Sequence, residues 1–557
     1  MSHTPRSIQE VASELHIGAE HFEPYGRGKG KLDLALLTQA PRGKGRLVLV
    51  TAINPTPAGE GKTTTSIGIA MGMRRLGKNA VLALREPSLG PVFGVKGGGT
   101  GGGKASLTPA DDINLHFTGD IHAITTAHNL LSAMIDNSLH FAEVFGDKGR
   151  LDSRQITWGR ALDMNDRALR NVMVGLGGKA HGVPRAERFD ITAASEIMAI
   201  LALATGPEDL EARLDRVIIG RTESGATLTA KDMGASRAMC AVLRDALKPN
   251  LVQTEEGGPA IVHCGPFANI AHGCNSVLAT RLAMNLGDYA ITEAGFGFDL
   301  GGEKFLDIKC RAMGVWPRAV VIVATLRALK MHGGAAVKVC GEPNADALAK
   351  GLSHLDKHLE NAQAFGLPAV VAINVFPNDT EEEIAMVADA AQKRGVRVGK
   401  SWGFGKGGEG TTELAQLVAD VVDATDANPP PPKYVYELTD PAEEKIRKIA
   451  RVVYGAKDVS FTGTAEKDLA RARELGFGDA PVCMAKTQLS LSDDPKRAGR
   501  PTDFTVAVRE VRIAAGAGFL VALTGEMMTM PGLPKIPAAR GVSLLPGGKI
   551  KGLMQND

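Results

Sequence analysis

Short apolar runs rich in β-branched residues recur along the chain, and segments with one apolar helical face follow several of them. The runs cover residues 47–53, 80–84, 217–219, 319–325, 369–375 and 519–523. Buried strands that alternate with amphipathic helices are typical of α/β proteins with largely parallel sheets. The pattern therefore predicts the α/β class, and no repeat of solenoid length is present.

Two helix starts are marked by their capping residues. Thr380 and Glu383 have the spacing of a capping box, so a helix is predicted to begin after Thr380. Asp440 is a typical N-cap residue, and Pro441 behind it suits the first helical position. The proline-rich stretch 428–433 between these helices indicates either a stiff spacer or an ordered surface loop within one domain.

Composition and charge narrow the class of protein. The length of 557 residues corresponds to three or four domains of about 150 residues each. The 64 basic and 62 acidic side chains leave a formal charge of +2, so no nucleic-acid partner is expected. The six cysteines form no CxxC pair, and no apolar run has the length of a signal segment or a membrane span. We therefore expect a cytoplasmic protein with reduced thiols and no membrane partner.

Glycine is the residue type that departs most from ordinary usage. The chain has 66 glycines, about 12% where about 7% is usual. They cluster, most densely in the tract 97–103, where every position except one is glycine. Clustered glycine indicates loops in which the backbone closely approaches a ligand or another segment. The tract is predicted to be a mobile boundary or a ligand-facing loop.

The strongest local motif predicts a phosphate-binding loop. The apolar run 47–53 leads into a loop that ends in Gly61-Lys62-Thr63, and a helical pattern follows. This order of strand, loop and helix is the one that a P-loop requires, because a helix N-terminus favours an anion. The residues expected to surround the phosphates of a nucleoside triphosphate are Thr56, Pro57, Ala58, Gly59, Glu60, Gly61, Lys62 and Thr63.

The chemistry of this loop is assigned to its last two residues. Lys62 is expected to contact the β- and γ-phosphates, and the Thr63 hydroxyl to bind the Mg²⁺ that accompanies the nucleotide. Thr56 occupies the position of the usual first glycine, which weakens the motif by one residue. The alternative is a glycine-rich connection that contains an incidental lysine.

Arg85 and Glu86 follow the next predicted strand, 80–84. Because ligands of doubly wound sheets bind at the carboxyl ends of the strands, we expect both residues beside the phosphates. Arg85 could neutralise charge on a transferred phosphoryl group, and Glu86 could help to hold the metal. The alternative is a surface Arg–Glu pair without a catalytic role.

Phe376 and Trp402 are predicted loop residues in a chain with only 4% aromatic residues. Rings on loops next to glycine and lysine can enclose a flat heterocycle, while the lysines bind its carboxylates. The alternative is that both rings close the edge of a local core.

Segments that contain histidine are weaker candidates. They lie at 114–122, 128–129, 263–264, 272–274 and 323–334. The first two could contact a small acid or a metal-bound water, but a histidine that is hydrogen-bonded within the core is the commoner case. The segment 323–334 is a strand that leads into a basic, glycine-terminated turn, which suits an anionic ligand or plain packing. The His–Cys pairs at 263–264 and 272–274 match no usual zinc spacing, so zinc is not expected.

Taken together, these motifs resemble those of the formate–tetrahydrofolate ligase family. The resemblance extends from about Tyr25 to the end of the chain and is carried by the phosphate loop and segments 85–91, 114–120, 292–297, 307–311, 323–334 and 529–534. The segment 94–104 departs from the family pattern, which usually has two alanines and a final tyrosine there. Phe298, Gly302 and His128 also replace residues that are typical of the family.

The resemblance implies a reaction and its site residues. ATP, formate and tetrahydrofolate, with or without a polyglutamate tail, would give 10-formyltetrahydrofolate, ADP and phosphate through formyl phosphate. It implies that Lys62, Arg85 and the Mg²⁺ at Thr63 serve phosphoryl transfer, and that Phe376 and Trp402 form the walls of the pterin pocket. Family members are also typically homotetramers that are activated by a monovalent cation, potassium or ammonium.

The family fold implies three domains around a cleft. Residues 1–96 with 235–355 would form a P-loop-type nucleotide-binding domain, 97–234 an inserted α/β domain, and 356–557 a C-terminal folate-side domain. Two rival functions remain open. One is a related P-loop enzyme that activates another small carboxylate, as dethiobiotin synthetase does with a carbamate. The other is a nucleotide switch whose output is the binding of a partner.

Overall fold

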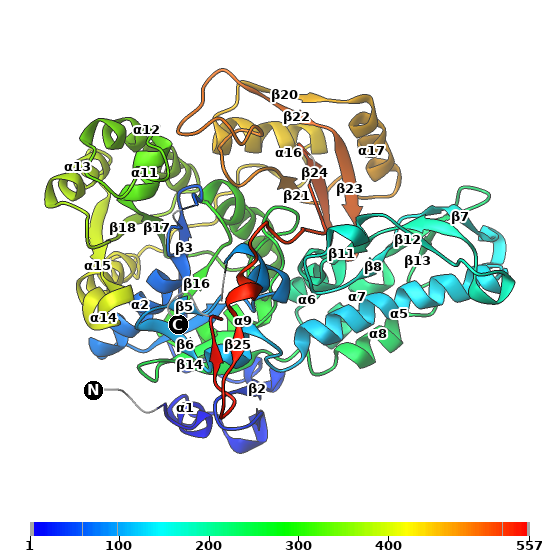
Figure 1. Ribbon diagram of the computed structural model, residues 1–557, viewed down its shortest axis with the longest axis horizontal. Helices are drawn as coiled ribbons and strands as arrows, with labels where there is room; N and C mark the ends of the chain where they lie inside the picture. The colour runs from blue at the N-terminus through cyan, green and yellow to red at the C-terminus, as the bar shows by residue number, and fades with distance from the viewer. Residues whose placement is uncertain (1–4, 58, 97–98, 526, 554–557) are drawn as a thin grey trace.

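The structure is a computed structural model that describes residues 5–57, 59–96, 99–525 and 527–553 (Figure 1). Ala58 of the predicted phosphate loop and Gly97 and Gly98 of the glycine tract lie outside the described residues. A body around strand β3 carries an elongated projection on one side, coloured cyan to green, and a third region above it, coloured orange (Figure 1). Within the described residues, no helix is both long and apolar enough to span a membrane.

The body is built on a large sheet whose central part is parallel. The parallel strands, in spatial order, are β15 (Pro259–Val262), β4 (Ala80–Leu84), β16 (Tyr289–Glu293), β3 (Arg46–Ala52), β17 (Ala319–Ala324), β18 (Ala369–Asn374) and β19 (Arg397–Ser401). Antiparallel strands extend the sheet beyond β15: β14 (Asn250–Thr254), β2 (Gly30–Leu32), β1 (Phe22–Pro24), β6 (Ala105–Thr108) and β5 (Gly101–Gly102). The predicted α/β class with a largely parallel sheet is therefore confirmed.

Helices cover both faces of this sheet, which explains why its strands read as continuous apolar runs. On one face, Val48 and Val50 share a core with α2 (Lys62–Arg75) and α15 (Thr412–Asp423). On the opposite face, alternate residues of β3 pack in a second core with α9 (Val277–Leu286) and α12 (Ala345–Ala364). With both faces covered, polar groups of the central strands reach solvent only at the strand ends.

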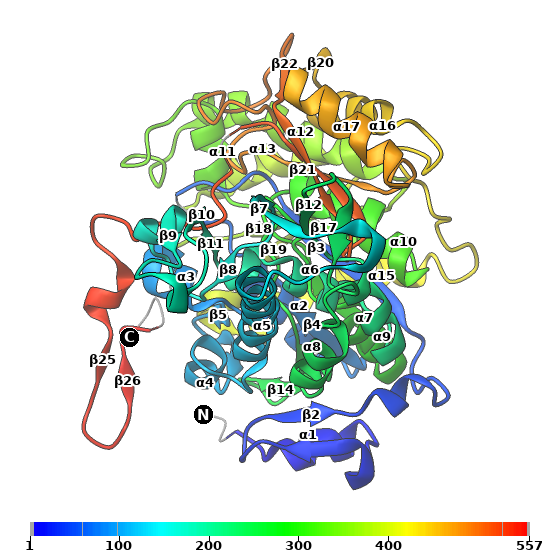
Figure 2. The same cartoon turned by 90° about the vertical axis from the view of Figure 1, so that its right-hand side faces the viewer.

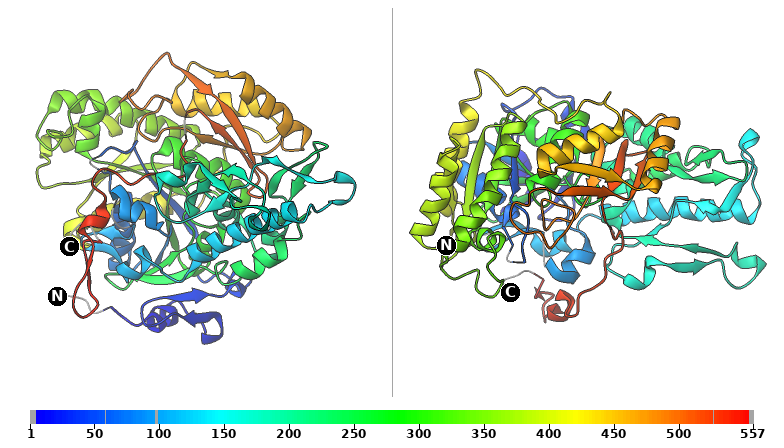
Figure 3. Two further views of the ribbon diagram at one scale, coloured as in Figure 1. Left: turned by 45° about the vertical axis from the view of Figure 1, so that its right-hand side comes forward. Right: turned by 90° about the horizontal axis from the view of Figure 1, so that it is seen from above.

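The projection and the third region flank the carboxyl ends of these strands (Figures 1 and 3). The projection contains α5 (Asp120–His140), α6 (Glu196–Leu203), α7 (Pro207–Asp215), α8 (Ser236–Leu243), β7 (Leu151–Ile156), β12 (Ile218–Thr222) and β13 (Thr227–Thr229). The third region contains α16 (Ala442–Ile449), α17 (Gly463–Glu474), β20 (Asp458–Phe461), β21 (Val482–Ala485), β22 (Thr505–Val508), β23 (Glu510–Ala514) and β24 (Phe519–Leu523). A C-terminal hairpin, β25 (Ser543–Leu544) with β26 (Ile550–Lys551), runs along the outside of the body (Figure 2).

The large sheet extends past the domain boundary predicted after residue 355. That boundary falls inside α12, and β18 and β19 continue the parallel order although both follow residue 355 in sequence. Periodicity identifies a strand but not the sheet that it joins, so the sequence could not show this extension. The division of the chain into three domains stays a prediction.

The predicted helix starts are correct to within one residue. Thr380 caps α13 (Glu381–Gln392) by accepting a hydrogen bond from the Glu383 amide. The Glu383 carboxylate does not complete a capping box, because it forms a buried ion pair with Lys330 at 3.0 Å. The N-cap of α16 is Pro441 rather than Asp440, and the helix begins at Ala442. A shift of one residue is within the usual uncertainty of helix ends.

Candidate active site

The loops that follow β3, β4, β16 and β18 bring charged side chains together at one edge of the sheet. Parallel strands end at the same edge, which is where ligands of open α/β sheets bind. The loop after β3 ends at Gly61, which is the N-cap of α2, so the predicted order of strand, loop and helix is present. Lys62 and Thr63 are the first two residues of that helix.

The conformation of the loop is fixed by Glu60 and Asn374. The Glu60 carboxylate accepts hydrogen bonds from the Thr56 amide at 2.7 Å and from the Thr56 hydroxyl at 3.1 Å. Thr56 thus helps to close the loop from the position where a glycine is usual. The Asn374 side-chain amide, at the end of β18, donates to the Glu60 carbonyl oxygen at 3.3 Å.

Gly61 is required at its position for two reasons, and we expect Gly61→Ala to lower the free energy of unfolding by about 2–4 kcal/mol. Its φ of 72° lies in the left-handed region, and a Cβ there would collide with the Asn374 side-chain nitrogen. Gly59 is the matched control, because its φ is 73° but no atom of the described residues lies within 4 Å of a Cβ there. Urea unfolding should show a loss for Gly59→Ala that is limited to the backbone cost of about 1 kcal/mol; equal losses for both variants would contradict the collision.

A cluster of four side chains lies beside this loop. The Thr63 hydroxyl donates to the Glu293 carboxylate at 2.9 Å, and the Arg85 guanidinium lies 3.9 Å from the other oxygen of that carboxylate. Burial lowers the pKa of Lys62, while the charges of Glu60 and Glu293 act in the opposite direction. The Nε of Arg85 is buried and has no hydrogen-bond partner within the described part of the chain. The predicted residues Lys62, Thr63 and Arg85 therefore lie together with an acid.

Glu293 is a member of this cluster that the sequence did not identify as functional. It is the last residue of β16, the strand between β3 and β4, and its side chain is only 4% exposed. Its partner Thr63 lies 230 residues away in sequence. The available signal was an acidic residue at the end of an apolar run, which many strands share.

Glu86 is placed in different surroundings from those predicted. Its side chain is buried, and its amide donates to the Cys264 carbonyl oxygen at 2.8 Å. Burial raises the pKa of the carboxyl group well above its usual value, and the negative charge of Asp120 adds to this effect. Lys31 opposes the shift. The acid that contacts Thr63 is Glu293, so the metal-binding role assigned to Glu86 has no support in these contacts.

Phe376 and Trp402 follow two adjacent parallel strands. Asn374 of β18 pairs in register with Ser401 of β19, so both aromatic residues lie just beyond the edge that carries the phosphate loop. Both side chains are half-buried. The Arg327 guanidinium lies 4.1 Å from the centre of the Phe376 ring, and the Lys406 amine lies 5.7 Å from a Trp402 ring. Each ring is thus accompanied by a cation.

Two of the other histidine candidates, His128 and His263, are core residues, whereas His116 and His122 are exposed. His128 bonds to the Ser195 hydroxyl and the Gly159 carbonyl oxygen, and burial lowers its pKa to about 4. His263 bonds to the Ser276 hydroxyl and the Ala246 carbonyl oxygen, and burial also lowers its pKa to about 4. Among the described residues, no group of three His, Cys, Asp or Glu side chains is placed to bind a metal.

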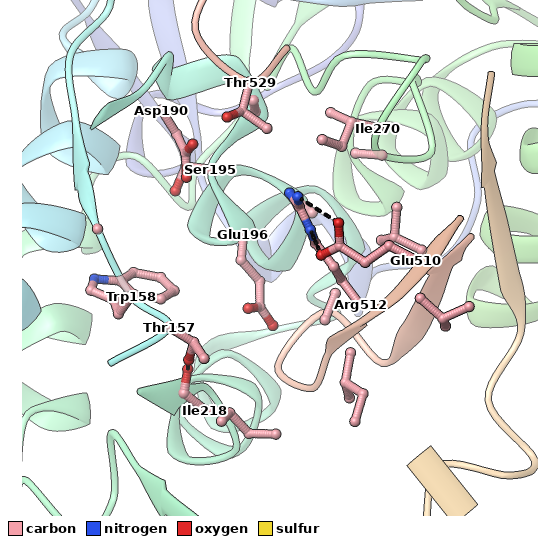
Figure 4. A pocket seen from close by; sticks show the side chains of 18 of the residues that line it. Thr157, Trp158, Asp190, Ser195, Glu196, Ile218, Ile270, Glu510, Arg512 and Thr529 are labelled. Atoms are coloured by element: carbon pink, nitrogen blue, oxygen red, sulfur yellow. Dashed lines mark hydrogen bonds and ion pairs between the residues drawn. The ribbon is translucent and has the colours of Figure 1, made fainter. Parts of the chain in front are cut away.

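A cavity of about 440 Å³ lies between the projection and the third region (Figure 4). Glu196 points into it, opposite an Arg512 that is already paired with Glu510 (Figure 4). The charged side chains that line the cavity balance in sign. The basic ones are Arg188, Arg221, Arg471 and Arg512, and the acidic ones are Asp190, Glu196, Asp468 and Glu510. A lining that balances in sign offers a triphosphate no excess of positive charge.

The fold and this cluster define an α/β protein of the class that binds its ligands in loops at the carboxyl edge of a parallel sheet. The model of the formate–tetrahydrofolate ligase family matches residues 1–554. A formate–tetrahydrofolate ligase from Myxococcus xanthus (strain DK1622) is 60% identical over 554 residues, covering 100% of both chains. The chain belongs to the formate–tetrahydrofolate ligase family and is a ligase, which confirms the resemblance found in the sequence and leaves the nucleotide-switch alternative without support.

Proposed function

We propose that this chain uses ATP to join formate to tetrahydrofolate, giving 10-formyltetrahydrofolate, ADP and phosphate. The observation that carries the proposal is the cluster of Lys62, Thr63, Arg85 and Glu293 at the phosphate loop of a chain that belongs to this family. Such a cluster combines two cations, which suit phosphate oxygens, with an acid and a hydroxyl, which suit a metal.

The reaction is proposed to pass through formyl phosphate. Formate is a poor acyl donor because displacement at its carbon would have to release oxide. Attack of a formate oxygen on the γ-phosphorus forms a P–O bond and releases ADP, and N10 of tetrahydrofolate then displaces phosphate from the formyl carbon. Phosphoryl transfer depends mainly on positioning and on neutralisation of charge, and we assign these tasks to Lys62 and Arg85.

The Thr63 hydroxyl and the Glu293 carboxylate fit a magnesium ion. Both offer the hard oxygen ligands that Mg²⁺ prefers, and they lie 2.9 Å apart at the start of α2. A bound Mg²⁺ would supply positive charge that offsets the negative charge of the transferred phosphoryl group. In its presence, Thr63 would present its oxygen to the metal while its hydroxyl keeps the hydrogen bond to the Glu293 carboxylate.

We propose that Phe376 and Trp402 form the walls of the folate pocket. Trp402→Ala is expected to raise KM for tetrahydrofolate about tenfold or more, because stacking of a heterocycle on an aromatic ring contributes about 1–3 kcal/mol. KM for ATP should change by less than about twofold, since Trp402 contacts no part of the phosphate loop in the hydrogen bonds and ring contacts described.

Trp402→Phe is the matched control for this prediction. It keeps a flat ring and should retain most of the affinity for tetrahydrofolate in steady-state kinetics. If KM for tetrahydrofolate is the same in the alanine variant as in the wild type, the ring closes the edge of a core and does not form the pocket.

Several further properties follow from family membership and stay predictions. They are activation by potassium or ammonium ions, assembly into a homotetramer, acceptance of polyglutamylated folates, a cytoplasmic location and the three-domain division around the site.

The test of the proposed function is the release of ADP in the presence of Mg²⁺ and potassium. ATP alone, ATP with formate, and ATP with formate and tetrahydrofolate are compared, and the formylated folate is measured in the same samples. We expect rapid release only when both substrates are present. Release that is independent of formate and tetrahydrofolate would contradict the proposal and would favour the nucleotide switch.

A further inference from the structure

We propose that three buried histidines, His332, His354 and His358, act as positioning residues for phosphoryl transfer by holding Asn54. Asn54 is the second residue after β3 and the last before the proline that opens the phosphate loop. We refer to the three histidines as the histidine clamp. The inference rests on the proposed function and adds to it a set of residues that contact neither the phosphates nor the metal.

The clamp binds the backbone and the side chain of Asn54 at once. The Asn54 amide donates to Nε2 of His354 at 3.3 Å, and its carbonyl oxygen lies 3.1 Å from Nε2 of His332. Its side-chain oxygen lies 3.2 Å from Nε2 of His358. Three imidazoles thus converge on one residue.

The remaining donor of Asn54 is also bound. Its side-chain nitrogen donates to the Asp299 carboxylate at 3.2 Å and to the Gln488 carbonyl oxygen at 2.9 Å. Asp299 is in turn paired with Lys486 at 2.8 Å, and both side chains are fully buried. Every polar atom of Asn54 therefore has a partner, and its orientation is fully determined.

The hydrogen bonds define one consistent set of neutral tautomers. Because Nε2 of His354 accepts the Asn54 amide, its proton is on Nδ1, which donates to the Gly499 carbonyl oxygen at 2.8 Å. Nδ1 of His332 accepts the Gly499 amide at 3.3 Å, so Nε2–H of His332 donates to the Asn54 carbonyl oxygen. Nε2–H of His358 donates to the Asn54 side-chain oxygen. The same Nε2 of His358 lies 3.3 Å from Nε2 of His354.

The clamp is neutral and closely packed. Burial lowers the pKa of all three imidazoles, that of His358 to about 3. The rings of His332 and His354 are stacked with centroids 3.7 Å apart. The Nδ1 of His358 has no hydrogen-bond partner within the described residues, so its polar contacts are Asn54 and His354.

Stability alone does not account for this arrangement. Apolar side chains of similar volume fill a core at least as well as polar groups, which must be desolvated and then fully bonded. Apolar side chains cannot, however, fix both peptide groups and the amide of one loop residue. A single loop joins Asn54 to Lys62 and Thr63 at the start of α2. A displacement of about 1 Å in a catalytic site costs about a hundredfold in rate.

The test compares variants of His354 in the full-length protein. His354→Leu removes both hydrogen bonds, whereas His354→Gln can still present an acceptor near the position of Nε2. We expect kcat to fall at least about tenfold in the leucine variant, with KM for tetrahydrofolate within about threefold of the wild type, and the glutamine variant to recover most of kcat. His263→Leu is the matched control, because His263 is equally buried and hydrogen-bonded but does not contact the loop.

Unfolding temperatures separate positioning from a structural role. If the clamp only stabilises the fold, His354→Leu and His263→Leu will both lower Tm and leave kcat of the folded protein unchanged, which would overturn the inference. If His354→Leu fails to fold, a second measurement replaces it. This measurement compares kcat of His358→Leu, of Asn54→Ala and of the variant that carries both substitutions. We expect kcat of the double variant to equal that of the slower single variant. A loss of kcat in the double variant equal to the product of the two single losses would show that His358 and Asn54 act independently and would refute the inference.

Failure of the clamp and failure of the proposed function give different results. If ADP release by the wild type depends on formate and tetrahydrofolate but the histidine variants retain full kcat, the clamp alone is refuted. If ADP release by the wild type does not depend on either substrate, the proposed function is refuted, and the clamp with it.

Discussion

Lys62→Ala is expected to lower kcat for ADP release in the presence of formate and tetrahydrofolate by about 10²–10³-fold or more. Lys62 is the first residue of α2, beside Thr63 and the acid that binds it. Its ammonium group would neutralise charge that develops on the γ-phosphoryl group in a site with little water, where a fixed cation has its largest effect. The measurement is steady-state ADP release at saturating substrates.

The loss should occur without unfolding. Burial disfavours the charged form of Lys62 and lowers its pKa, so its removal relieves a desolvation cost, and Tm should change little. Lys231→Ala is the matched control, because the Lys231 side chain is 74% exposed and lies on the projection. A Lys62→Ala enzyme that keeps kcat within tenfold of the wild type would show that the loop does not bind the reacting phosphates.

Glu293→Gln is expected to raise the Mg²⁺ concentration for half-maximal activity at least about tenfold and to lower kcat about a hundredfold. The amide oxygen of glutamine can still accept the Thr63 hydroxyl, so the change removes the negative charge and keeps the hydrogen bond. Loss of that charge weakens the attraction for a divalent ion and leaves Arg85 without its counter-charge at 3.9 Å. Activity is measured across a titration of Mg²⁺ at fixed ATP.

Glu20→Gln provides the comparison for this variant, since the Glu20 side chain is 71% exposed and distant in sequence from the phosphate loop. It should leave the Mg²⁺ titration unchanged. If Glu293→Gln lowers kcat but leaves the Mg²⁺ requirement at the wild-type value, Glu293 acts by orienting Arg85 and not by holding the metal.

Local signals in the sequence identified the fold class and part of the candidate site, whose role stays a prediction. The apolar runs 47–53 and 319–325 became the adjacent strands β3 and β17, because a strand covered on both faces must be apolar throughout. The loop before Lys62 was recognisable because strand, glycines and helix are contiguous in sequence. These features need no information about distant parts of the chain.

Groups that function through distant contacts were not predictable in the same way. Glu293 joins the candidate site through a hydrogen bond from Thr63. The pKa of Glu86 is shifted by burial and by the charges of Lys31 and Asp120. The segment that contains His332 was noted only as a basic, glycine-terminated turn that suits an anion, because no local pattern shows that three histidines meet at Asn54. Pattern reasoning identifies the elements of the chain but not the pairs that the fold brings together.

The hydrogen bond between Asn54 and the Gln488 carbonyl oxygen spans 434 residues, and this separation has a consequence during synthesis of the protein. At about 5–20 residues per second, the phosphate loop leaves the ribosome about 20–90 s before Gln488 does. During that interval the growing chain has the loop but not the Gln488 carbonyl oxygen that binds the Asn54 side chain. We expect nascent and truncated chains that lack Gln488 to hydrolyse ATP more slowly than the full-length protein.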